Sequence, residues 1–256
     1  MRAIHLAFQI VQKSINIQHN ATRILFTATK LRKLFQTTKF FEDFLIFLPN
    51  FEDILEENPQ AGNWHTVFGN NHPIHIEVGM GKGQFITTLA QQNPEINYIG
   101  IEMYDSVLLR AIQKKEALAE EGQELSNLKF MRMDARLLPE VFEKGEVSRI
   151  YLNFSDPWPK ARHASRRLTS REFLARYDKI LKEDGTIEFK TDNRGLFDYS
   201  LEEFPATGYR ISAVTYNLHS GGYHGVLTDY EAKFAGLGTP ICRCVAVKEP
   251  DAYRRN

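Results

Sequence analysis

The sequence predicts an α/β fold in which helices cover both faces of a mostly parallel β-sheet. From residue 73 onward, short apolar runs alternate with segments of helical pattern. A glycine-rich turn joins the first such run to the first helix, and acidic residues end three successive runs. Strands that alternate with helices form βαβ units, and the sheets of such units are buried on both faces. A chain of 256 residues can hold one such domain with an appendage.

Each element follows from an apolar run or from a helical pattern between two runs. Strands are predicted at 74–78, 98–101, 128–133, 150–152, 186–189, 209–216 and 241–247. Helices are predicted at 84–92, 106–120, 170–181, 194–203 and 229–237, with a short turn near 137–142 and a glycine-rich loop at 220–225. The acidic stretch 51–57 is expected to form a short helix ahead of this domain.

The composition is that of an ordinary soluble globular protein, with 43% apolar and 25% charged residues. The net charge is +0, so any indication of a nucleic-acid partner must come from local clustering of charge. No apolar run approaches the ~18 residues of a membrane span. Cys242 and Cys244 lie on one face of a predicted strand, which favours small core residues in a reducing, cytoplasmic compartment. His72 and His75 lack the partners of a metal site, so no metal is expected.

Residues 1–41 differ from the rest of the chain, since they contain seven Lys or Arg and no Asp or Glu. Such a basic, weakly amphipathic segment is typical of a targeting segment, a nucleic-acid arm or a loosely attached helix. It could also reflect where the reading frame was opened. We favour a poorly anchored basic helix or tail, and we assign residues 1–62 to an N-terminal extension and 63–256 to the main domain.

The glycine-rich turn has the pattern of a nucleotide-binding loop. Gly79, Gly81 and Gly83 follow the first strand of the main domain and precede a helix. Glycines allow a sharp turn and close approach to a ligand, and the helix N-terminus adds free N–H groups. The spacing is not that of a P-loop, and Gln84 occupies the last glycine position of the dinucleotide motif.

Acidic side chains end three successive strands, at Glu77, Glu102 and Asp134. Glu77 would repel a pyrophosphate but would attract the amino group and sulfonium of S-adenosylmethionine. Glu102 can bind both ribose hydroxyls, and Asp134 can accept from the adenine amine. The pattern therefore favours S-adenosylmethionine over NAD as the cofactor.

A proline-rich loop follows the strand at 150–152 and carries Asp156, Trp158 and Lys160. A cationic segment comes next, and arginines in such a cluster suit phosphate. We interpret the loop as a site for a planar nucleobase beside a grip on the nucleic-acid backbone. Trp158 could stack on the base or form a wall of the loop, and His163 could be a spacer. The cationic segment could also be only a solvated turn.

From about Asn63 to the C-terminus, the sequence resembles the bacterial tRNA (guanine-N7)-methyltransferases. The resemblance is carried by short motifs: Phe68-Gly-Asn70, Pro73-Ile-His-Ile-Glu-Val-Gly79, Gly81-Lys-Gly83, Asn97-Tyr-Ile-Gly-Ile-Glu102, Tyr151-Leu-Asn-Phe-Ser-Asp-Pro-Trp-Pro-Lys160, Arg162-His163, Arg166-Arg-Leu-Thr169, Phe189-Lys-Thr-Asp-Asn-Arg-Gly-Leu-Phe197 and Thr228-Asp-Tyr-Glu231. The resemblance implies a Rossmann-like class I methyltransferase with a mostly parallel seven-stranded sheet and an antiparallel last strand. Nothing in residues 1–41 matches the basic segment with which the family usually opens.

The resemblance also implies a role for individual residues in methylating the variable-loop guanine of tRNA, position 46. The implied S-adenosylmethionine contacts are Glu77, Gly79, Gly81, Gly83, Glu102, Asp134 and Asp156, with Asp156 also catalytic. The implied substrate contacts are Lys160, Asp192, Thr228, Asp229, Tyr230 and Glu231. The implied RNA contacts are Arg162, His163, Ala164, Ser165, Arg166 and Arg167. The family includes monomers and homodimers, and the sequence does not choose between them.

Guanine N7 has an in-plane lone pair and needs no prior deprotonation, so we assign Asp156 a positioning and electrostatic role. Asp192 or Asn193 could instead simply cap the helix that follows. Two other classes of protein remain open on the residues alone. An NAD(P)-dependent oxidoreductase would share the sheet and the glycine loop, and an RNA-binding module could have lost catalysis.

Overall fold

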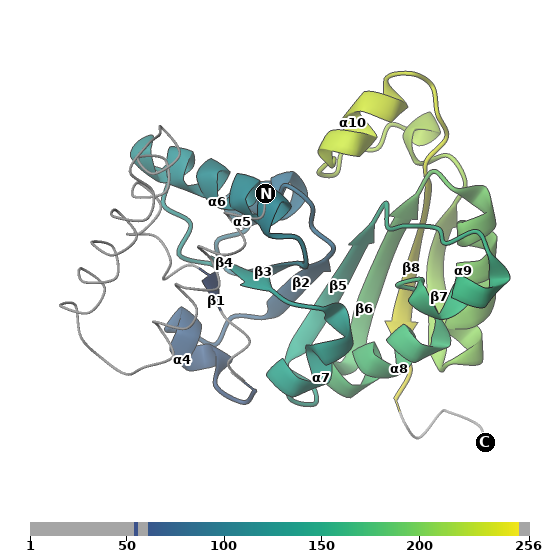
Figure 1. Cartoon of the computed structure of the whole chain (residues 1–256), viewed down its shortest axis with the longest axis horizontal. Helices are drawn as coiled ribbons and strands as arrows, with labels where there is room; N and C mark the ends of the chain where they lie inside the picture. The colour runs from purple at the N-terminus through teal and green to yellow at the C-terminus, as the bar shows by residue number, and fades with distance from the viewer. Residues whose placement is uncertain (1–53, 56–60, 251–256) are drawn as a thin grey trace, which may run out of the picture. The chain divides into compact units, whose positions relative to one another are not determined.

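An eight-stranded β-sheet forms the centre of the part of the chain that the computed structural model describes, residues 54–55 and 61–250 (Figure 1). The strand order is β1-β4-β3-β2-β5-β6-β8-β7. The bounds are β1 Ile54–Leu55, β2 Ile74–Val78, β3 Asn97–Glu102, β4 Leu128–Arg132, β5 Val147–Asn153, β6 Leu181–Thr191, β7 Tyr209–Thr215 and β8 Cys242–Lys248. The strands from β1 to β6 pair in parallel, whereas β8 is antiparallel to both β6 and β7.

This topology confirms the predicted α/β class and the antiparallel last strand. The seven expected strands correspond to β2–β8, and β1 adds a two-residue strand at one edge. β2 and β3 are buried along their whole length, as expected for parallel strands covered on both faces. Their apolar runs therefore supply the centre of the core, where Ile76, Ile99 and Ile150 are almost fully buried.

Helices cover both faces of the sheet. Figure 1 shows α5 and α6 on one face, and α7, α8 and α9 on the other. The bounds are α4 Trp64–Phe68, α5 Gln84–Gln92, α6 Asp105–Glu120, α7 Leu138–Val141, α8 Arg171–Ile180, α9 Arg194–Ala206 and α10 Asp229–Ala235. Short 3₁₀ turns are η2 Ala135–Leu137, η3 Ala161–Arg166 and η4 Leu218–Gly221. The helix α10 lies beyond the arrowheads of β5 and β6.

One prediction for the N-terminal part is wrong. Residues 51–57 were expected to form a helix, but Ile54–Leu55 is a strand that pairs with Phe130 and Met131 of β4. A free sheet edge offers unpaired N–H and C=O groups, and pairing with it outweighs the weak helical preference of a short acidic stretch. The expectations for residues 1–41 lie outside the described residues.

The order of strands changes direction between β2 and β5. The chain runs outward from β2 through β3 and β4 on one side, and through β5 and β6 on the other. Loops at the carboxyl ends of two such strands diverge, and the crevice between them is where open α/β sheets bind ligands. The predicted acids and the proline-rich loop all lie at this end of the sheet.

Candidate active site

The glycine loop between β2 and α5 is held against the end of β3. The N–H groups of Gly79 and Met80 donate to the carbonyl oxygen of Ile101, at 2.9 and 3.1 Å. Gly79, Gly81 and Gly83 have φ values of 73°, 59° and 72°, in the left-handed region that glycine tolerates best. A Cβ at Gly83 would lie 2.8 Å from the Cβ of Ala111, so α5 and α6 also need glycine there in order to pack.

Glu77 lies near the carboxyl end of β2 and is only 2% exposed. Its Oε1 accepts a hydrogen bond of 2.8 Å from Nδ2 of Asn153, at the end of β5. Burial raises the pKa of Glu77 to about 8, and the hydrogen bond from Asn153 and the charge of Lys190 oppose this rise.

Three buried polar atoms near the tips of β2 and β5 have no hydrogen-bond partner: Oε2 of Glu77, Oδ1 of Asn153 and Oγ of Ser155. A buried polar group without a partner is costly and points to a missing ligand, water or ion. Oδ1 of Asn153 can only accept, Oε2 of Glu77 accepts once its carboxyl is ionised, and the Ser155 hydroxyl can also accept, so the group that fits is a cationic donor that favours the ionised carboxylate. The amino group of S-adenosylmethionine is such a donor, and it carries the charge that Glu77 would balance.

Glu102, at the end of β3, organises the backbone around the same crevice. Its Oε2 accepts from the N–H of Gly81 at 3.1 Å, and its Oε1 accepts from the N–H groups of Met103 and Tyr104. The carboxylate is 7% exposed and ties the glycine loop to the start of α6. Its predicted contact with ribose hydroxyls stays a prediction.

Asp134 follows β4 and caps the turn η2. Its carboxylate accepts from the backbone N–H of Arg136 at 2.8 Å and from two guanidinium nitrogens of Arg136 at 2.9 and 2.6 Å. These hydrogen bonds lower the pKa of Asp134. A carboxylate offers about four acceptor positions, so one remains for the predicted adenine amine.

The proline-rich loop after β5 is strained and strongly braced. Phe154 and Trp158 have φ values of 51° and 42°, a region that costs a residue other than glycine about 1–2 kcal/mol. The Arg167 guanidinium donates to the carbonyl oxygens of Pro157 and Trp158, at 3.0 and 3.1 Å. Strain of this kind persists where the surroundings enforce it, often at functional sites. Arg167 therefore supports the loop that carries Asp156.

The Trp158 ring contacts two residues of the cationic segment. The Arg166 guanidinium carbon lies 4.9 Å from its ring centroid, and the His163 ring meets it edge-on at 5.6 Å. His163 is therefore a packing partner of Trp158, and the choice between a wall and a stacking platform stays open. Five predicted site residues of the proline-rich loop and η3 are exposed: Asp156, Lys160, Arg162, Ser165 and Arg166. Ala164 is half-buried.

Asp192 and Tyr230 come together across the same end of the sheet. The Tyr230 hydroxyl donates to Oδ2 of Asp192 at 2.8 Å, and this hydrogen bond raises the pKa of Tyr230. The Phe154 ring lies 4.8 Å from the Tyr230 ring, so the proline-rich loop and α10 meet here. The cap of α9 is Asn193, whose side chain accepts from the N–H of Leu196 at 2.8 Å. Asp192 is thus free of the capping role that the sequence left open.

The other predicted substrate residues on α10 divide into two kinds. Asp229 is exposed. Burial lowers the pKa of Lys114 on α6, and the negative charge of Asp229 opposes this shift. Thr228 and Glu231 form a capping box, and the Glu231 side chain is fully buried. Its Oε2 lies 2.7 Å from Nζ of Lys190, which is also fully buried.

Sequence reasoning missed Asn153 and Lys190, although each is a polar residue in or ending an otherwise apolar strand.

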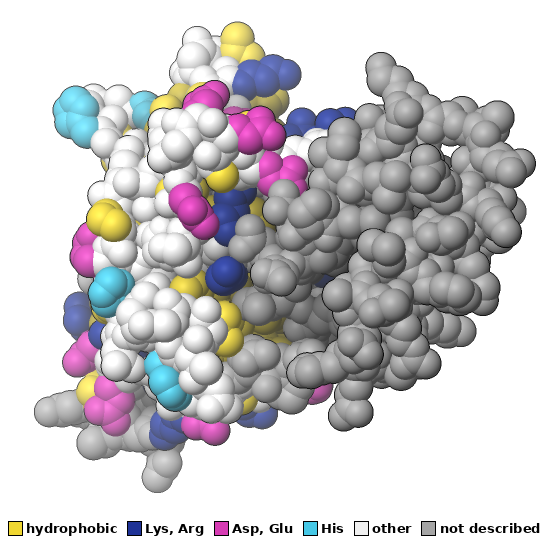
Figure 2. Space-filling model, turned by 90° about the vertical axis from the view of Figure 1, so that its left-hand side faces the viewer, with side chains coloured by type: hydrophobic (Ala, Val, Ile, Leu, Met, Phe, Trp, Pro, Cys, Tyr) yellow, Lys and Arg dark blue, Asp and Glu magenta, His cyan; other side chains and the backbone are white. Residues whose placement is uncertain are grey.

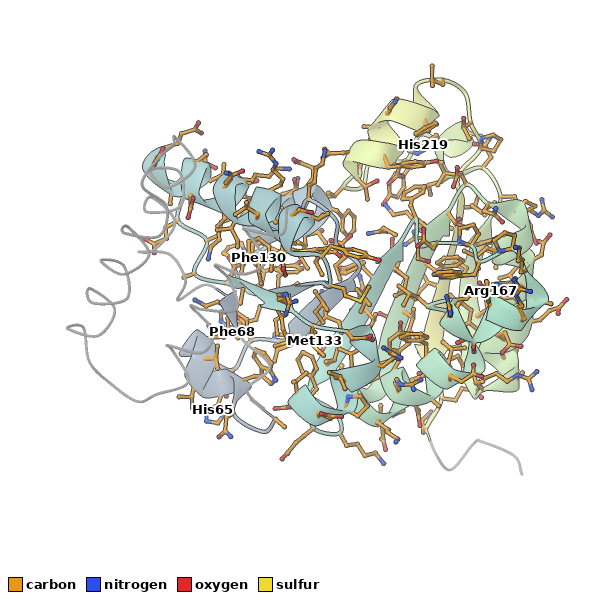
Figure 3. The ribbon with its side chains drawn as sticks, in the orientation of Figure 1. His65, Phe68, Phe130, Met133, Arg167 and His219 are labelled. Atoms are coloured by element: carbon orange, nitrogen blue, oxygen red, sulfur yellow. The ribbon has the colours of Figure 1, made fainter. Side chains whose placement is uncertain are left out.

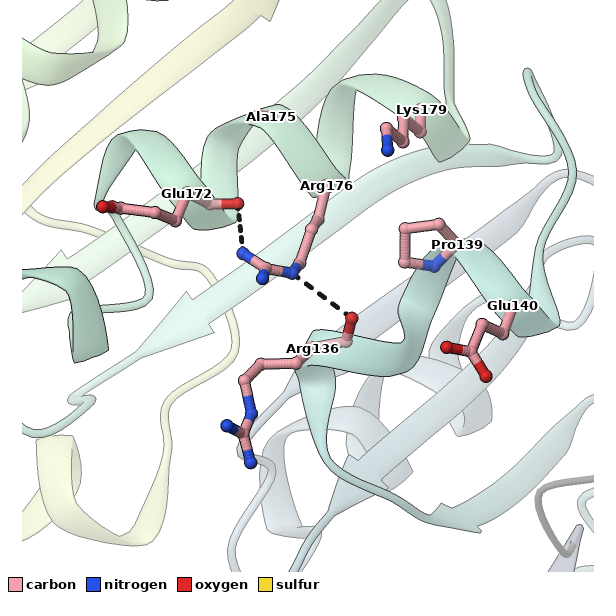
Figure 4. Close-up of a pocket in the computed structure, with 7 residues that line it drawn as sticks. All are labelled: Arg136, Pro139, Glu140, Glu172, Ala175, Arg176 and Lys179. Atoms are coloured by element: carbon pink, nitrogen blue, oxygen red, sulfur yellow. Dashed lines mark hydrogen bonds between the residues drawn. The ribbon is translucent and has the colours of Figure 1, made fainter.

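A separate pocket of about 550 Å³ lies against α7 and α8 (Figure 4). Its lining mixes three cations with two acids, and the Arg176 guanidinium donates to the carbonyl oxygens of Arg136 and Glu172. None of the predicted site residues lines it. The distribution of charge elsewhere is also mixed, since Figure 2 shows positive and negative side chains interspersed over the described part of one face.

Comparison with known proteins identifies the family. The family model described as "Putative methyltransferase" matches residues 71–244. A tRNA (guanine-N(7)-)-methyltransferase of Lachnoclostridium phytofermentans is 58% identical over 203 residues, which is 78% of this chain and 92% of that protein. The enzyme of the same name from Bacillus subtilis is 52% identical over 200 residues, covering 77% and 92%. The chain belongs to the bacterial tRNA (guanine-N7)-methyltransferase family.

Solved structures confirm the fold expected of this methyltransferase. The 16S rRNA methyltransferase KamB is similar with a TM-score of 0.58 at 13% identity, covering 75% of this chain and 95% of that one. A 16S rRNA (adenine-N1)-methyltransferase from Catenulisporales acidiphilia, solved with its cosubstrate SAM, gives a TM-score of 0.55 at 13% identity, covering 76% and 93%. The cofactor of the family is S-adenosylmethionine, and the unpartnered atoms around Glu77 fit its charged amino group.

Residues 54–55 and 61–250 contain neither a candidate metal cluster nor a candidate membrane span. No cluster of three or more His, Cys, Asp or Glu side chains that could hold a metal ion occurs there. Among the same residues, no helix is both long and apolar enough to span a membrane.

Proposed function

We propose that this chain transfers the methyl group of S-adenosylmethionine to N7 of the variable-loop guanine of tRNA, position 46. Membership of the family supports the tRNA guanine as the substrate, and the residues at the strand ends support the cofactor. The single observation that carries the proposal is the set of unpartnered buried acceptors at Glu77, Asn153 and Ser155, directly beside the loop that carries Asp156.

S-adenosylmethionine supplies an activated methyl group on a positively charged sulfur. The protein has to align the N7 lone pair of guanine with the methyl–sulfur axis at about 3–3.5 Å. The purine gains positive charge as the methyl moves, and carboxylates near it stabilise that charge. We assign this role to Asp156 and Asp192, with Asp156 also holding the base through its N1–H or amine. No base has to remove a proton before the attack.

The RNA backbone would lie along the exposed cations of the proline-rich loop and η3, which are Lys160, Arg162 and Arg166. Neutralising phosphates with these residues releases counterions, so binding should weaken as salt rises. Arg167 belongs to the loop's support, because its guanidinium is occupied by two backbone carbonyl groups. In folded RNA the groove hides N7, and we infer that the target base opens locally.

The domain assignment is also proposed. Residues 63–256 would form the methyltransferase domain and residues 1–62 an extension, of which Ile54–Leu55 joins the domain's sheet as β1. The match of the family model over residues 71–244 supports the assignment of the main domain. We propose a cytoplasmic location, in keeping with a tRNA substrate and the two free cysteines. A monomer and a homodimer are both compatible with the described residues.

The test is to incubate unmodified tRNA with the protein and labelled S-adenosylmethionine, and to map modified nucleosides by mass. We expect 7-methylguanosine in the variable loop, and no product from Asp156→Ala, which should keep the wild-type melting temperature because Asp156 is exposed. Full activity in Asp156→Ala would refute its role. Retention of NAD but not of S-adenosylmethionine in equilibrium dialysis would overturn the cofactor and favour an oxidoreductase.

A further inference from the structure

A buried ion pair joins α10 to the central sheet. Nζ of Lys190, near the end of β6, lies 2.7 Å from Oε2 of Glu231 in the first turn of α10, and both side chains have no exposed surface. Nζ of Lys190 also donates to the carbonyl oxygen of Val226 at 3.3 Å, in the segment that leads into α10. Burying two charges is expensive and often gains no stability over apolar packing, so such a pair calls for another explanation.

Glu231 is the centre of this network. Its Oε1 lies 3.1 Å from Nε2 of His219 in η4, beside α10 in Figure 3. The Glu231 backbone N–H donates to Oγ1 of Thr228 at 2.9 Å, which completes the capping box. One carboxylate thus connects β6, η4 and the start of α10. With no exposed surface, it cannot contact a nucleic-acid substrate in this arrangement.

The residue next to Glu231 points to what the network does. Tyr230 is 39% exposed, donates to Asp192 two positions after Lys190, and packs against Phe154 of the proline-rich loop. The ion pair and the Tyr230–Asp192 hydrogen bond therefore both connect the end of β6 to the start of α10. The ion pair lies on the buried side, and the hydrogen bond lies on the exposed side. A shift of α10 would move Tyr230 away from Asp192.

We infer that Lys190 and Glu231 are positioning residues, whose buried ion pair fixes α10 so that Tyr230 and Asp192 form the substrate side of the site. This inference rests on the proposed function, because it takes Asp192 and Tyr230 as the groups that meet the guanine. It replaces the direct substrate contact that the family resemblance implied for Glu231.

The test compares Lys190→Met and Glu231→Gln with Lys248→Met in the full chain. Lys248 is a matched control, since it is also a fully buried lysine of the sheet and donates to the carbonyl oxygens of Asp178 and Leu181 at 2.7 and 3.0 Å. Glutamine at position 231 can still close a capping box, so Glu231→Gln removes the charge and leaves the cap. All three variants should melt at a lower temperature than the wild type.

Hydrogen exchange separates positioning from simple stability. In Lys190→Met and Glu231→Gln, amides of residues 226–237 should exchange about tenfold faster or more, whereas Lys248→Met should leave them unchanged. The kcat/KM for tRNA should fall about 100-fold in the first two variants, as expected for a misplacement of about 1 Å, and little in the control. The dissociation constant of S-adenosylmethionine in Glu231→Gln should stay close to the wild-type value.

The double variant Lys190→Met/Glu231→Gln, which has no unpaired buried charge, should recover melting temperature but keep the fast exchange and the low kcat/KM. Recovery of kcat/KM together with melting temperature would show that the pair serves stability alone and would overturn the inference. Unchanged exchange of 226–237 in both single variants would also overturn it. The exchange readout needs no substrate, so it does not depend on whether the proposed reaction is correct.

Discussion

Replacing Glu77 by Gln should weaken cofactor binding and should also change how the dissociation constant depends on pH. Burial raises the pKa of Glu77 from 4.5 to about 8, so the free protein holds this carboxyl protonated at neutral pH. A cationic ligand binds the ionised form, and binding must therefore release a proton below pH 8. About 1% of Glu77 is ionised at pH 6 and about half at pH 8, so the ionisation of Glu77 alone should lower the dissociation constant about 50-fold between these values. Deprotonation of the cofactor's amino group near pH 8 reduces the net fall to about 25-fold.

The raised pKa of Glu77 strengthens cofactor binding as the pH rises, but it lowers the stability of the free protein over the same pH range. The folded pKa is above the unfolded one, so the stability contributed by protonated Glu77 is complete below pH 4.5 and is lost as pH rises through about 8. The full difference is on the order of 5 kcal/mol. Glu77→Gln lacks this titration, and its free energy of unfolding should therefore decline less than that of the wild type between pH 5 and 8.

Isothermal titration calorimetry in two buffers of different ionisation enthalpy, at pH 6, 7 and 8, measures the affinity and the released protons together. The amino group of the cofactor also titrates at about pH 8, and Glu77→Gln retains that contribution, so the difference between the two proteins isolates Glu77. The variant should bind weakly with little dependence on pH from 6 to 7. Equal pH slopes in both proteins, with no proton released by the wild type, would refute this reasoning.

Four further substitutions test the glycine loop, the RNA contacts, the support of the proline-rich loop and α10. Gly83→Ala should lower the free energy of unfolding by about 2–4 kcal/mol in thermal denaturation, because of its positive φ and the clash with Ala111, and an unchanged value would contradict the packing described. Arg162→Ala should reduce the salt slope of tRNA binding by about 1, whereas Arg167→Lys should leave the slope unchanged and lower kcat, and the reverse pattern in filter binding and kinetics would show their roles exchanged. Tyr230→Phe should raise KM for tRNA about two- to tenfold with cofactor affinity unchanged, and a KM equal to that of the wild type would exclude the Tyr230 hydroxyl from substrate binding.

Local patterns predicted much of this fold because they coincide with what the sheet requires. The run at 74–78 and the helix at 84–92 were predicted with the observed bounds, since β-branched residues at 74, 76 and 78 and the glycine turn that follows them are strong signals. The strand Ile54–Leu55 was not predicted, because two residues carry almost no periodicity and their partner in β4 is more than 70 residues away. Edge pairing of this kind is decided by the rest of the sheet.

The candidate site shows the same division between local and distant information. Acids at strand ends could be read from the sequence, because strand ends meet at one edge of a parallel sheet. The burial of Glu231 could not, since it depends on Lys190, which is 41 residues distant. One local signal was available: Thr228 followed three residues later by Glu231 is the pattern of a capping box. Likewise, Arg167 could be recognised as cationic, but not as the support of the loop that carries Trp158.

The most direct test of the account is a crystal structure of the protein with S-adenosylmethionine bound. The account predicts the ligand in the crevice between β2 and β5, with its amino group within about 3 Å of Oε2 of Glu77 and its methyl group directed toward Asp156. A ligand bound elsewhere, or one whose amino group leaves the buried oxygens of Glu77 and Asn153 without a partner, would contradict it.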